Sequence, residues 1–414
     1  MRAKILITVS LLALAGCATE TPTSSSDSTP TSSPSLRAES EVTHPGGFDA
    51  WKSGFRSKVL ARGISADIFD RAFAGTGVNS TVLRLDRNQA EFTKTLTQYL
   101  DSAVNTRTIS IGRSKASSLD GILDRMEAQT GVDRGVVLAV WGRESGFGNN
   151  FGNIPIAEAL GTLAYDGRRR AWAEEQLYAA LRIMQNGDVA PERMIGSWAG
   201  ALGHTQFIPT SYMSYAIDGD GDGRRDLWNV TDALYSTANY LKRNGWQKGQ
   251  PWGMEVNLPV GFNLGSISEK VRKPTSTWNS MGVTLANGAA IPNYGDSSII
   301  APSGSSGPKF VVFKNFRVIK TYNNSSFYAI AVGHLGDRIM GGGALKNAGP
   351  WDPNLLKADE MNALQTALNR KGYKIEKIDG IYGDQTEAAI RGYQASNGLP
   401  VDGLASRALY ERLK

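Results

Sequence analysis

The sequence predicts a mainly α-helical protein with a small inserted β subdomain and a separate three-helix module at its C-terminus. Three observations predict this fold class. Apolar residues recur at helical spacing over most of the chain, as at Phe48, Trp51 and Phe55. Residues 252–285 are instead divided by Pro and Gly into short apolar runs, which favour strands. Residues 350–414 carry nine basic and nine acidic side chains, whereas the 414-residue chain has a net charge of +6, so this tail is a distinct module.

Residues 1–16 have the composition of an export signal. A short basic start is followed by the apolar run Ile5 to Ala15, which is too short to cross a bilayer as a permanent helix. The run ends in Leu14-Ala15-Gly16-Cys17, which resembles the bacterial lipoprotein signal. We therefore expect cleavage before Cys17 and lipidation of its thiol; the alternative is a chance cysteine near an ordinary cleavage site. Ala18 follows instead of an acidic residue, which by the same resemblance favours the outer membrane of a Gram-negative bacterium, facing the periplasm.

Residues 17–47 are expected to form a disordered tether. From Thr21 to Ser35 every residue except Asp27 is Ser, Thr or Pro, a composition that cannot build a packed core. Folding is expected to begin near Phe48, and residues 48–345 are predicted to form one domain. The single cysteine excludes an internal disulfide and a thiolate zinc site. Without an arginine-rich tract, the basic excess predicts no nucleic-acid partner and suits a polyanionic polymer outside the cell better.

The stretch Trp141-Gly142-Arg143-Glu144-Ser145-Gly146-Phe147-Gly148 places one carboxylate at the end of an apolar helix. Asp133 can cap the start of this helix, and the glycines after Ser145 end it. At helical spacing Glu144 shares a stripe with Val137, Val140 and Trp141, so its carboxyl should be partly desolvated. Burial and the negative end of the helix dipole both raise a carboxyl pKa. Glu144 is therefore the candidate general acid; the alternative is a solvated Glu at a frayed helix end.

Residues 197–212 form a second candidate segment, rich in glycine and aromatic residues. Small residues let the backbone approach a ligand closely. Gln206 can bond a sugar amide or hydroxyl group, and Ser197 can orient the carboxyl of Glu144. The alternative is an ordinary corner between two helices.

The run Asp218-Gly219-Asp220-Gly221-Asp222-Gly223-Arg224 matches the start of an EF-hand calcium loop. The twelfth position, which usually holds a bidentate Glu, is Asn229. Asp232 can supply the missing carboxylate if the loop is longer than usual. The predicted structural Ca²⁺ ligands are Asp218, Asp220, Asp222, Arg224 and Asp232; the alternative is a metal-free Asp/Gly turn. The glycines of residues 146–152 do not have the spacing of a dinucleotide fingerprint, so no organic cofactor is expected.

The C-terminal module is expected to be a repeat of Gly turns that lead into helices. Met361, Leu364 and Leu368 mark one helix face, and Asp384 with Glu387 predicts a capping box for a second helix. The turn at residues 379–383 is echoed at residues 402–406. About 60 residues are sufficient for such a module to fold alone.

Taken together, these segments resemble the membrane-bound lytic murein transglycosylase B family of peptidoglycan-cleaving enzymes. The resemblance runs from about Phe48 to Leu345. It rests on the Glu144 stretch, on residues 163–169 (Leu-Ala-Tyr-Asp-Gly-Arg-Arg), on residues 199–209, and on Tyr322-Asn323 with Tyr328 downstream. The tail at residues 350–414 looks like the peptidoglycan-binding domain often fused to wall enzymes.

The resemblance implies a lysozyme-like catalytic domain and a role for each motif residue. Glu144 would act as general acid and then base, cleaving the β-1,4 bond between N-acetylmuramic acid and N-acetylglucosamine with formation of 1,6-anhydromuramic acid. The expected substrate-binding residues are Ser197, Gln206, Tyr165, Tyr322 and Tyr328. Two alternatives stay open: a hydrolytic muramidase that pairs Glu144 with Asp166, and a non-catalytic, lipid-anchored peptidoglycan-binding protein. The sequence predicts no particular protein partner.

Overall fold

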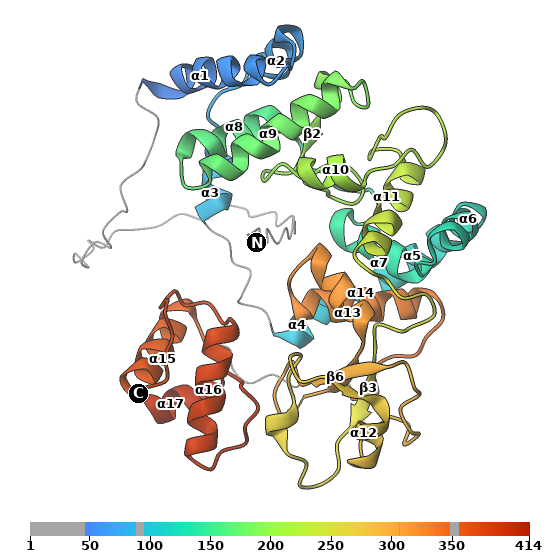
Figure 1. The fold of residues 1–414 in the computed structure, drawn as a ribbon, viewed down its shortest axis with the longest axis vertical. Coiled ribbons are helices and arrows are strands. Elements are labelled where there is room, and N and C mark those ends of the chain that lie inside the picture. Colours follow the sequence, from blue (N-terminus) through green and yellow to red (C-terminus); the bar gives the residue numbers. More distant parts are fainter. Residues whose placement is uncertain (1–45, 88–94, 306, 348–355) are drawn as a thin grey trace, which may run out of the picture. The chain divides into compact units, whose positions relative to one another are not determined.

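The computed structural model describes residues 46–87, 95–305, 307–347 and 356–414 (Figure 1). The predicted export signal, Cys17 and the tether up to residue 45 lie outside the described residues. Contacts divide the rest into two units, so the predicted domain 48–345 contributes to both. Residues 46–87 and 149–230 form the helical unit, and residues 95–148, 231–347 and 356–414 form the α/β unit. Among the described helices, none combines the length and the apolar character that a membrane span needs.

The helical unit packs its longer helices around aromatic side chains. Trp51, Phe55 and Val59 follow one another at four-residue spacing along the first helix and are buried, as the sequence predicts. The elements of this unit are α1 (Gly47–Ala61), α2 (Ala66–Ala72), α3 (Ser80–Arg87), β1 (Ile154–Pro155), α8 (Ile156–Asp166), α9 (Arg170–Gln185), the 3-10 turn η1 (Pro191–Arg193), β2 (Ile195–Gly196) and α10 (Pro209–Tyr215). Helix α9 packs on both α8 and α10, and β1 pairs with β2 in antiparallel fashion.

The α/β unit combines helices with one five-stranded sheet. Its elements up to residue 347 are α4 (Leu96–Ala103), α5 (Thr106–Ser118), α6 (Asp120–Thr130), α7 (Arg134–Ser145), α11 (Val230–Arg243, which begins at the boundary of the unit), β3 (Gly253–Asn257), η2 (Leu264–Ser266), β4 (Lys273–Pro274), α12 (Thr275–Ser280), β5 (Thr284–Leu285), β6 (Asp296–Ile300), β7 (Lys309–Val312), α13 (Lys314–Tyr322) and α14 (Ser326–Ile339). The two longest helices, α11 and α14, and the helix α7 carry most of the residues discussed below.

The sheet confirms the predicted β subdomain and extends it. Its strand order is β4-β6-β7-β3-β5, and every neighbouring pair is antiparallel. The strand expected near Phe310 is β7, the central strand. Strand β6 was not predicted, because its polar start Asp296-Ser297-Ser298 hides the apolar pattern. All but its first residue are nevertheless buried.

Helix α7 begins and ends where the sequence predicts. The Asp133 carboxylate accepts the N–H groups of Gly135 at 2.7 Å and Val136 at 3.2 Å, which caps the first turn. Gly146 ends the helix in the left-handed conformation with φ 59°. The stripe of Val137, Val140 and Trp141 is buried as predicted, but burial is not confined to it, because residues 135–141 are buried on every side of the helix. Glu144 therefore projects from a core helix.

Helices α7 and α14 run antiparallel, and their backbones come into close contact where a glycine of each helix faces the other. A Cβ added to Gly336 would lie 2.9 Å from the backbone of Gly135, so neither position has room for a side chain. At the other end of the pair, Glu144 of α7 meets Tyr328 of α14. The two contacts are separated by nine residues on one helix and eight on the other, or about 12 to 14 Å. This matched spacing fixes the register of the helix pair.

The turn after Glu144 folds back under its own helix. Phe147 is buried and has φ 61°, a conformation that a bulky side chain rarely adopts. Its ring lies edge-to-face on Trp141, with centroids 5.6 Å apart, and covers Gly142, where an added Cβ would lie 2.6 Å from the ring. The hydroxyl of Ser145 accepts the N–H of Gly148 at 3.0 Å. Gly142 is therefore required by the ring of Phe147.

The C-terminal module consists of α15 (Ala358–Arg370), α16 (Asp384–Ser396) and α17 (Arg407–Leu413). The predicted face with Met361, Leu364 and Leu368 is buried in its core. The predicted capping box is wrong, because Gly383 is the N-cap residue of α16 and makes no side-chain cap. The reason is that the helix begins with Asp384. Its carboxylate therefore lies in the first turn, where it interacts favourably with the positive end of the helix dipole instead of capping the helix.

The repeat seen in the C-terminal sequence has a structural basis. Gln365, buried on α15, accepts the N–H of Gly380 at 3.0 Å, and Gln394, buried on α16, accepts the N–H of Gly403 at 2.8 Å. Each glutamine also donates its amide to the Asp that precedes the glycine. The module is thus two copies of one helix-turn unit that share α16.

We predict that Gly142→Ala destabilises the protein by about 1 to 3 kcal/mol, because the new methyl group must displace the ring of Phe147. Urea unfolding of the variant measures the change. The matched control is Gly121→Ala on the exposed face of α6, where the nearest atom to an added Cβ is 3.7 Å away. That substitution should be neutral or stabilise the helix by up to about 1 kcal/mol. Equal stability of the two variants would contradict the role assigned to Phe147.

Candidate active site

Glu144 and Tyr328 form the centre of the candidate active site, although 184 residues separate them in the chain. Tyr328 lies in the first turn of α14, which Ser325 caps by accepting the N–H of Tyr328 at 3.3 Å. Its hydroxyl donates a hydrogen bond of 2.5 Å to Oε1 of Glu144. The residue Glu144 keeps a partly exposed surface, whereas Tyr328 is buried. The carboxyl group of Glu144 is therefore held by a hydrogen bond from Tyr328, while part of the residue stays accessible to solvent.

The environment of Glu144 favours the protonated form of its carboxyl group up to near-neutral pH. Desolvation by burial raises the pKa of Glu144 from its usual 4.5 to about 7, against the opposing effects of the Tyr328 hydrogen bond and the positive charge of Arg143. Burial and the nearby carboxylate also raise the pKa of Tyr328 well above its usual 10. Tyr328 therefore keeps its proton and acts as a donor throughout the neutral range. A carboxyl with a pKa near 7 can give up a proton and take one back in the same environment.

Further tyrosines extend the site along α13 and α11. Tyr322, at the end of α13, stacks on Tyr328 with ring centroids 6.5 Å apart and an interplanar angle of 7°. Tyr240 of α11 meets Tyr322 edge-on at 5.0 Å, and its hydroxyl donates to the carbonyl of Thr321 at 2.5 Å. The structure thus brings together three predicted residues, Glu144, Tyr322 and Tyr328. Sequence reasoning missed Tyr240, which has no local motif and lies here only because α11 packs beside the end of α13.

The positive charge of Arg143 acts on the carboxyl group of Glu144. Its guanidinium lies over the ring of Tyr99 at 5.2 Å, and Tyr99 packs edge-on against Phe327, the neighbour of Tyr328. Nε of Arg143 is buried without a hydrogen-bond partner among the described residues. The charge of Arg143 lowers the pKa of Glu144 and so limits the shift caused by burial.

Ser197 and Gln206 belong to one buried loop of the helical unit. The hydroxyl of Ser197 accepts the N–H of Ala201 at 3.0 Å. The side-chain amide of Gln206 donates to the carbonyls of Gly203 at 2.9 Å and Phe151 at 3.3 Å. Gln206 also has φ 51°, a left-handed conformation that costs free energy for a residue with a side chain. The loop is thus a rigid, strained segment, as at many functional sites; the roles predicted for Ser197 and Gln206 stay predictions.

Tyr165 and Asp166 end helix α8 in the helical unit. The ring of Tyr165 lies edge-on to Phe48 with centroids 5.7 Å apart. Asp166 is buried, and its carboxylate pairs with Arg87 at 3.1 Å and with Arg168 at 3.4 Å. Both of its oxygens are therefore occupied by guanidinium groups in a structural ion-pair network. A buried carboxylate with both oxygens occupied is not free to contact a sugar or a water, which disfavours Asp166 as the second carboxylate of a hydrolase.

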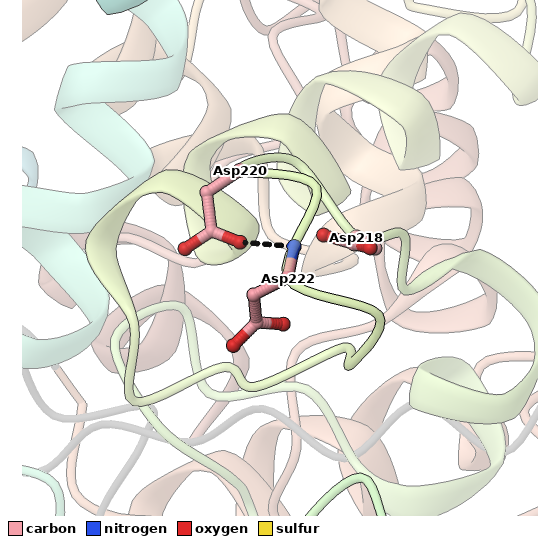
Figure 2. A group of neighbouring side chains, drawn as sticks. All are labelled: Asp218, Asp220 and Asp222. Atoms are coloured by element: carbon pink, nitrogen blue, oxygen red, sulfur yellow. Dashed lines mark hydrogen bonds between the residues drawn. The ribbon is translucent and has the colours of Figure 1, made fainter.

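The acidic run forms an ordered loop after α10 (Figure 2). Oxygens of Asp218, Asp220 and Asp222 all lie within 4.8 Å of one another, and the three residues are exposed. Asp218 accepts the N–H groups of Gly221 at 2.6 Å and Gly223 at 2.8 Å, and these bonds lower the pKa of its carboxyl. Three converging carboxylates that offer only oxygen fit a hard cation such as Ca²⁺.

The remaining predicted calcium ligands have other surroundings. Arg224 donates its backbone N–H to Asp222 at 2.8 Å, which orients that carboxylate. Asn229, at the twelfth position, donates its amide to Asp220 at 2.6 Å and is no substitute for the usual Glu. Asp232 is buried in the first turn of α11 and is not one of the three gathered carboxylates. An ion pair of 2.6 Å between Arg225 and Asp188 anchors the loop to the turn that follows α9.

Two family models match the chain. Residues 47–337 match the Transglycosylase SLT domain, and residues 357–413 match the Putative peptidoglycan binding domain. The chain is also 33% identical over 224 residues to the membrane-bound lytic murein transglycosylase B of Escherichia coli strain K12. This match spans 52% of the chain and 60% of the length of that relative.

Solved structures of similar proteins confirm the predicted fold class, a mainly α, lysozyme-like domain followed by a helical binding module. SltB3 from Pseudomonas aeruginosa, in complex with NAG-NAM-pentapeptide, is 46% identical with a TM-score of 0.87, over 89% of this chain and 100% of its own. The same protein in complex with NAG-anhNAM-pentapeptide has a TM-score of 0.86 at 45% identity, over 89% and 99%. Escherichia coli Slt35 in complex with calcium is 27% identical with a TM-score of 0.61, over 70% and 92%.

We predict that Glu144→Gln stabilises the protein at neutral pH. Both proteins should be equally stable below about pH 4.5, where the carboxyl is protonated in the folded and the unfolded chain. As the pH rises towards 7, the unfolded chain ionises freely while burial opposes ionisation in the folded chain, so wild type loses stability relative to the variant. The difference should reach about 1 to 3 kcal/mol and level off above pH 7. Denaturant unfolding from pH 4 to 8 measures it; a difference that does not vary with pH would contradict the raised pKa.

Proposed function

Because this chain belongs to the Transglycosylase SLT domain family, we propose that it cleaves peptidoglycan by lytic transglycosylation, without water. The bond cut is the β-1,4 bond between N-acetylmuramic acid and N-acetylglucosamine, and the product ends in 1,6-anhydromuramic acid. The observation that carries the proposal is the Glu144 carboxyl, with its pKa near 7 and its hydrogen bond from Tyr328. One carboxyl that can serve as acid and then as base is sufficient for this reaction.

The first step breaks the glycosidic bond. Protonated Glu144 gives its proton to the bridging oxygen, so the N-acetylglucosamine side leaves as an alcohol and the bonding electrons go with that oxygen. The acetamido oxygen of the muramic acid then stabilises the cationic C1. The charge left on Glu144 is accommodated by the hydroxyl of Tyr328, which already donates to Oε1.

The second step closes the ring. Ionised Glu144 takes the proton of the C6 hydroxyl while the C6 oxygen bonds to C1 and the acetamido oxygen is released. Glu144 is then protonated again and ready for another cleavage. No atom of water enters, which distinguishes this reaction from two-carboxyl hydrolysis.

We propose that the remaining motif residues bind the glycan. Tyr322 and Tyr328 offer stacked aromatic faces with polar edges, which suit sugar rings. Ser197, Gln206 and Tyr165 are assigned to substrate binding on the strength of the family motifs. The module at residues 350–414 would hold the enzyme on peptidoglycan, as the match to the Putative peptidoglycan binding domain supports, while residues 48–345 carry the reaction.

Calcium is proposed as a structural ion of the loop after α10. Asp218, Asp220 and Asp222 would hold it, with Arg224 as a backbone contact and Asp232 as the additional carboxylate; calcium would cancel the repulsion between these carboxylates. Slt35, a structure of similar fold, was solved with calcium. The ion would fix the loop and take no part in bond cleavage. No organic cofactor is required.

We propose a lipid anchor at Cys17 and a periplasmic location at the outer membrane. The support is the signal sequence together with the membrane-bound relative of Escherichia coli. Among the alternatives, a muramidase pairing Glu144 with Asp166 is disfavoured because Asp166 is buried and both of its carboxylate oxygens are held by arginines. A binding-only protein is disfavoured by the raised pKa of Glu144, since wall binding alone gives no reason for it.

Mass spectrometry of purified peptidoglycan digested with the soluble protein tests the reaction. We expect muropeptides that end in anhydromuramic acid, each one water lighter than a hydrolytic product. Glu144→Gln should lower the rate about 100-fold or more, because it removes the proton donor. Products with free reducing muramic acid would favour the muramidase. No released muropeptides, with wild type and variant alike, would favour the binding-only protein.

Removal of calcium should lower the melting temperature of wild type, because an ion that binds the folded chain stabilises it by mass action. The measurement is a thermal melt with and without chelator. Asp218→Ala should melt lower than wild type in calcium and should not respond to chelator. The calcium proposal fails if wild type shows no shift, or if the variant shifts by the same amount.

A further inference from the structure

The helical unit has a cavity of about 330 Å³ between the start of α3, strand β1 and the first turn of α8. Its lining residues are Asn79, Thr81, Asn153, Ile154, Pro155 and Glu158. Four of these side chains carry hydrogen-bonding groups, and the other two add an apolar surface. A few polar groups beside an apolar wall are typical of a small-molecule site, and a volume at the low end for such sites suits one sugar ring.

Asn79 and Glu158 place a hydrogen-bond donor next to an acceptor in this cavity. Oδ1 of Asn79 caps α3 by accepting the N–H groups of Thr81 at 3.0 Å and Val82 at 3.2 Å. The backbone N–H of Asn79 donates to the hydroxyl of Thr162 on α8 at 3.0 Å. These bonds orient the side-chain amide of Asn79, whose nitrogen donates to Oε1 of Glu158 at 2.7 Å.

The pair keeps one donor and one acceptor for a ligand. The second amide hydrogen of Asn79 and Oε2 of Glu158 make no hydrogen bond with the described residues. Both residues are partly exposed, and Oε2 of Glu158 is not among the buried polar atoms without a partner. A ligand in the cavity can therefore reach these two groups.

The wall formed by residues 153–155 is shared with the loop that carries Ser197. Ile154 pairs with Gly196, the residue before Ser197, in the ladder of β1 and β2. A Cβ added to Gly152 would lie 2.6 Å from the backbone nitrogen of Ser197, so the two chain segments are in direct contact. The cavity therefore adjoins a loop that is assigned to substrate binding, and a glycan is the ligand expected there.

Two neighbouring hydroxyl groups of a sugar match this pair, because one can accept from Asn79 while the other donates to Glu158. In the glycan of peptidoglycan, O3 of each N-acetylmuramic acid carries a lactyl ether, and O4 of each interior unit lies in a glycosidic bond. Free hydroxyls at both C3 and C4 therefore occur at one place, the N-acetylglucosamine at a non-reducing end. The proposed reaction creates such an end, since the N-acetylglucosamine side leaves as an alcohol.

We propose that this cavity binds the N-acetylglucosamine unit at the non-reducing end of a glycan strand, through the Asn79 amide and the Glu158 carboxylate. Ile154 and Pro155 would pack on the apolar face of the sugar ring. The inference rests on the proposed function, because it takes peptidoglycan as the ligand. The cavity would give the enzyme a second glycan contact, specific for strand ends, besides the residues around Glu144.

The test compares two isomeric disaccharides by calorimetric titration of protein that carries Glu144→Gln, so that no turnover interferes. N-acetylglucosaminyl-N-acetylmuramic acid presents the free hydroxyl pair, whereas N-acetylmuramyl-N-acetylglucosamine has the same mass and charge but lacks it. Adding Glu158→Gln keeps an acceptor for the Asn79 amide and puts a donor where Oε2 lies. It should weaken binding of the first disaccharide about tenfold, the effect of one hydrogen bond to a charged group, and leave the second unchanged.

The matched control is Glu175→Gln, which removes the same charge from an exposed position of α9 in the same unit and should change neither affinity. Thr81→Phe is a second variant, because a ring at this exposed position would fill the cavity. It should also weaken binding of the first disaccharide, and it decides alone if Glu158→Gln lowers the melting temperature.

Equal affinities of variant and parent for the first disaccharide would overturn the proposal, as would an equal loss for both disaccharides. Digestion of peptidoglycan by wild type separates this inference from the proposed function. If no anhydro products appear but binding depends on Glu158, the lytic reaction alone is contradicted. If anhydro products appear but binding does not depend on Glu158, the cavity site alone is contradicted.

Discussion

The close packing of α7 against α14 is the constraint on which the candidate site depends. Gly135 and Gly336 let the two backbones meet, and Tyr328 reaches Glu144 at the opposite end of the same pair. Because the helices are antiparallel and rigid, a side chain at either glycine would change the position of Tyr328 along with the distance between the helices. The hydrogen bond between Tyr328 and Glu144 therefore depends on two glycines that lie about 12 Å or more away along the helices.

The pKa of Glu144 results from a balance that the fold must hold within limits. Burial alone drives the pKa upwards, and a carboxyl that stays protonated at every physiological pH could not accept the second proton. The hydrogen bond from Tyr328 and the charge of Arg143 both pull the pKa down. Each comes from a neighbour that is itself fixed, Tyr328 by the capped start of α14 and Arg143 by the ring of Tyr99. These two interactions keep the pKa of Glu144 in a range in which the carboxyl can both donate and accept a proton.

Local signals in the sequence were sufficient for the helix that carries Glu144 but not for its surroundings. Asp133 and Gly146 mark the ends of α7 through interactions with near neighbours, so its bounds could be predicted. The hydrogen bond from Tyr328 crosses 184 residues, and only the resemblance to a family suggested that this tyrosine belongs to the site. That burial extends beyond the predicted stripe could not be foreseen, because the glycines at 135 and 142 count as neutral in a hydrophobic pattern, whereas here they mark faces covered by α14 and Phe147.

Backbone strain is concentrated in two of the family motifs. Among the described residues, Phe147 and Gln206 are the two non-glycine positions with left-handed φ, and each lies in a segment that the sequence marked as a candidate site. Such conformations persist only where other interactions outweigh them. The burial of the Phe147 ring supplies that free energy in one turn, and two amide hydrogen bonds of Gln206 supply it in the other. A relaxed turn would lower the local cost, but in the first case it would release the end of α7 and with it the position of the Glu144 carboxyl.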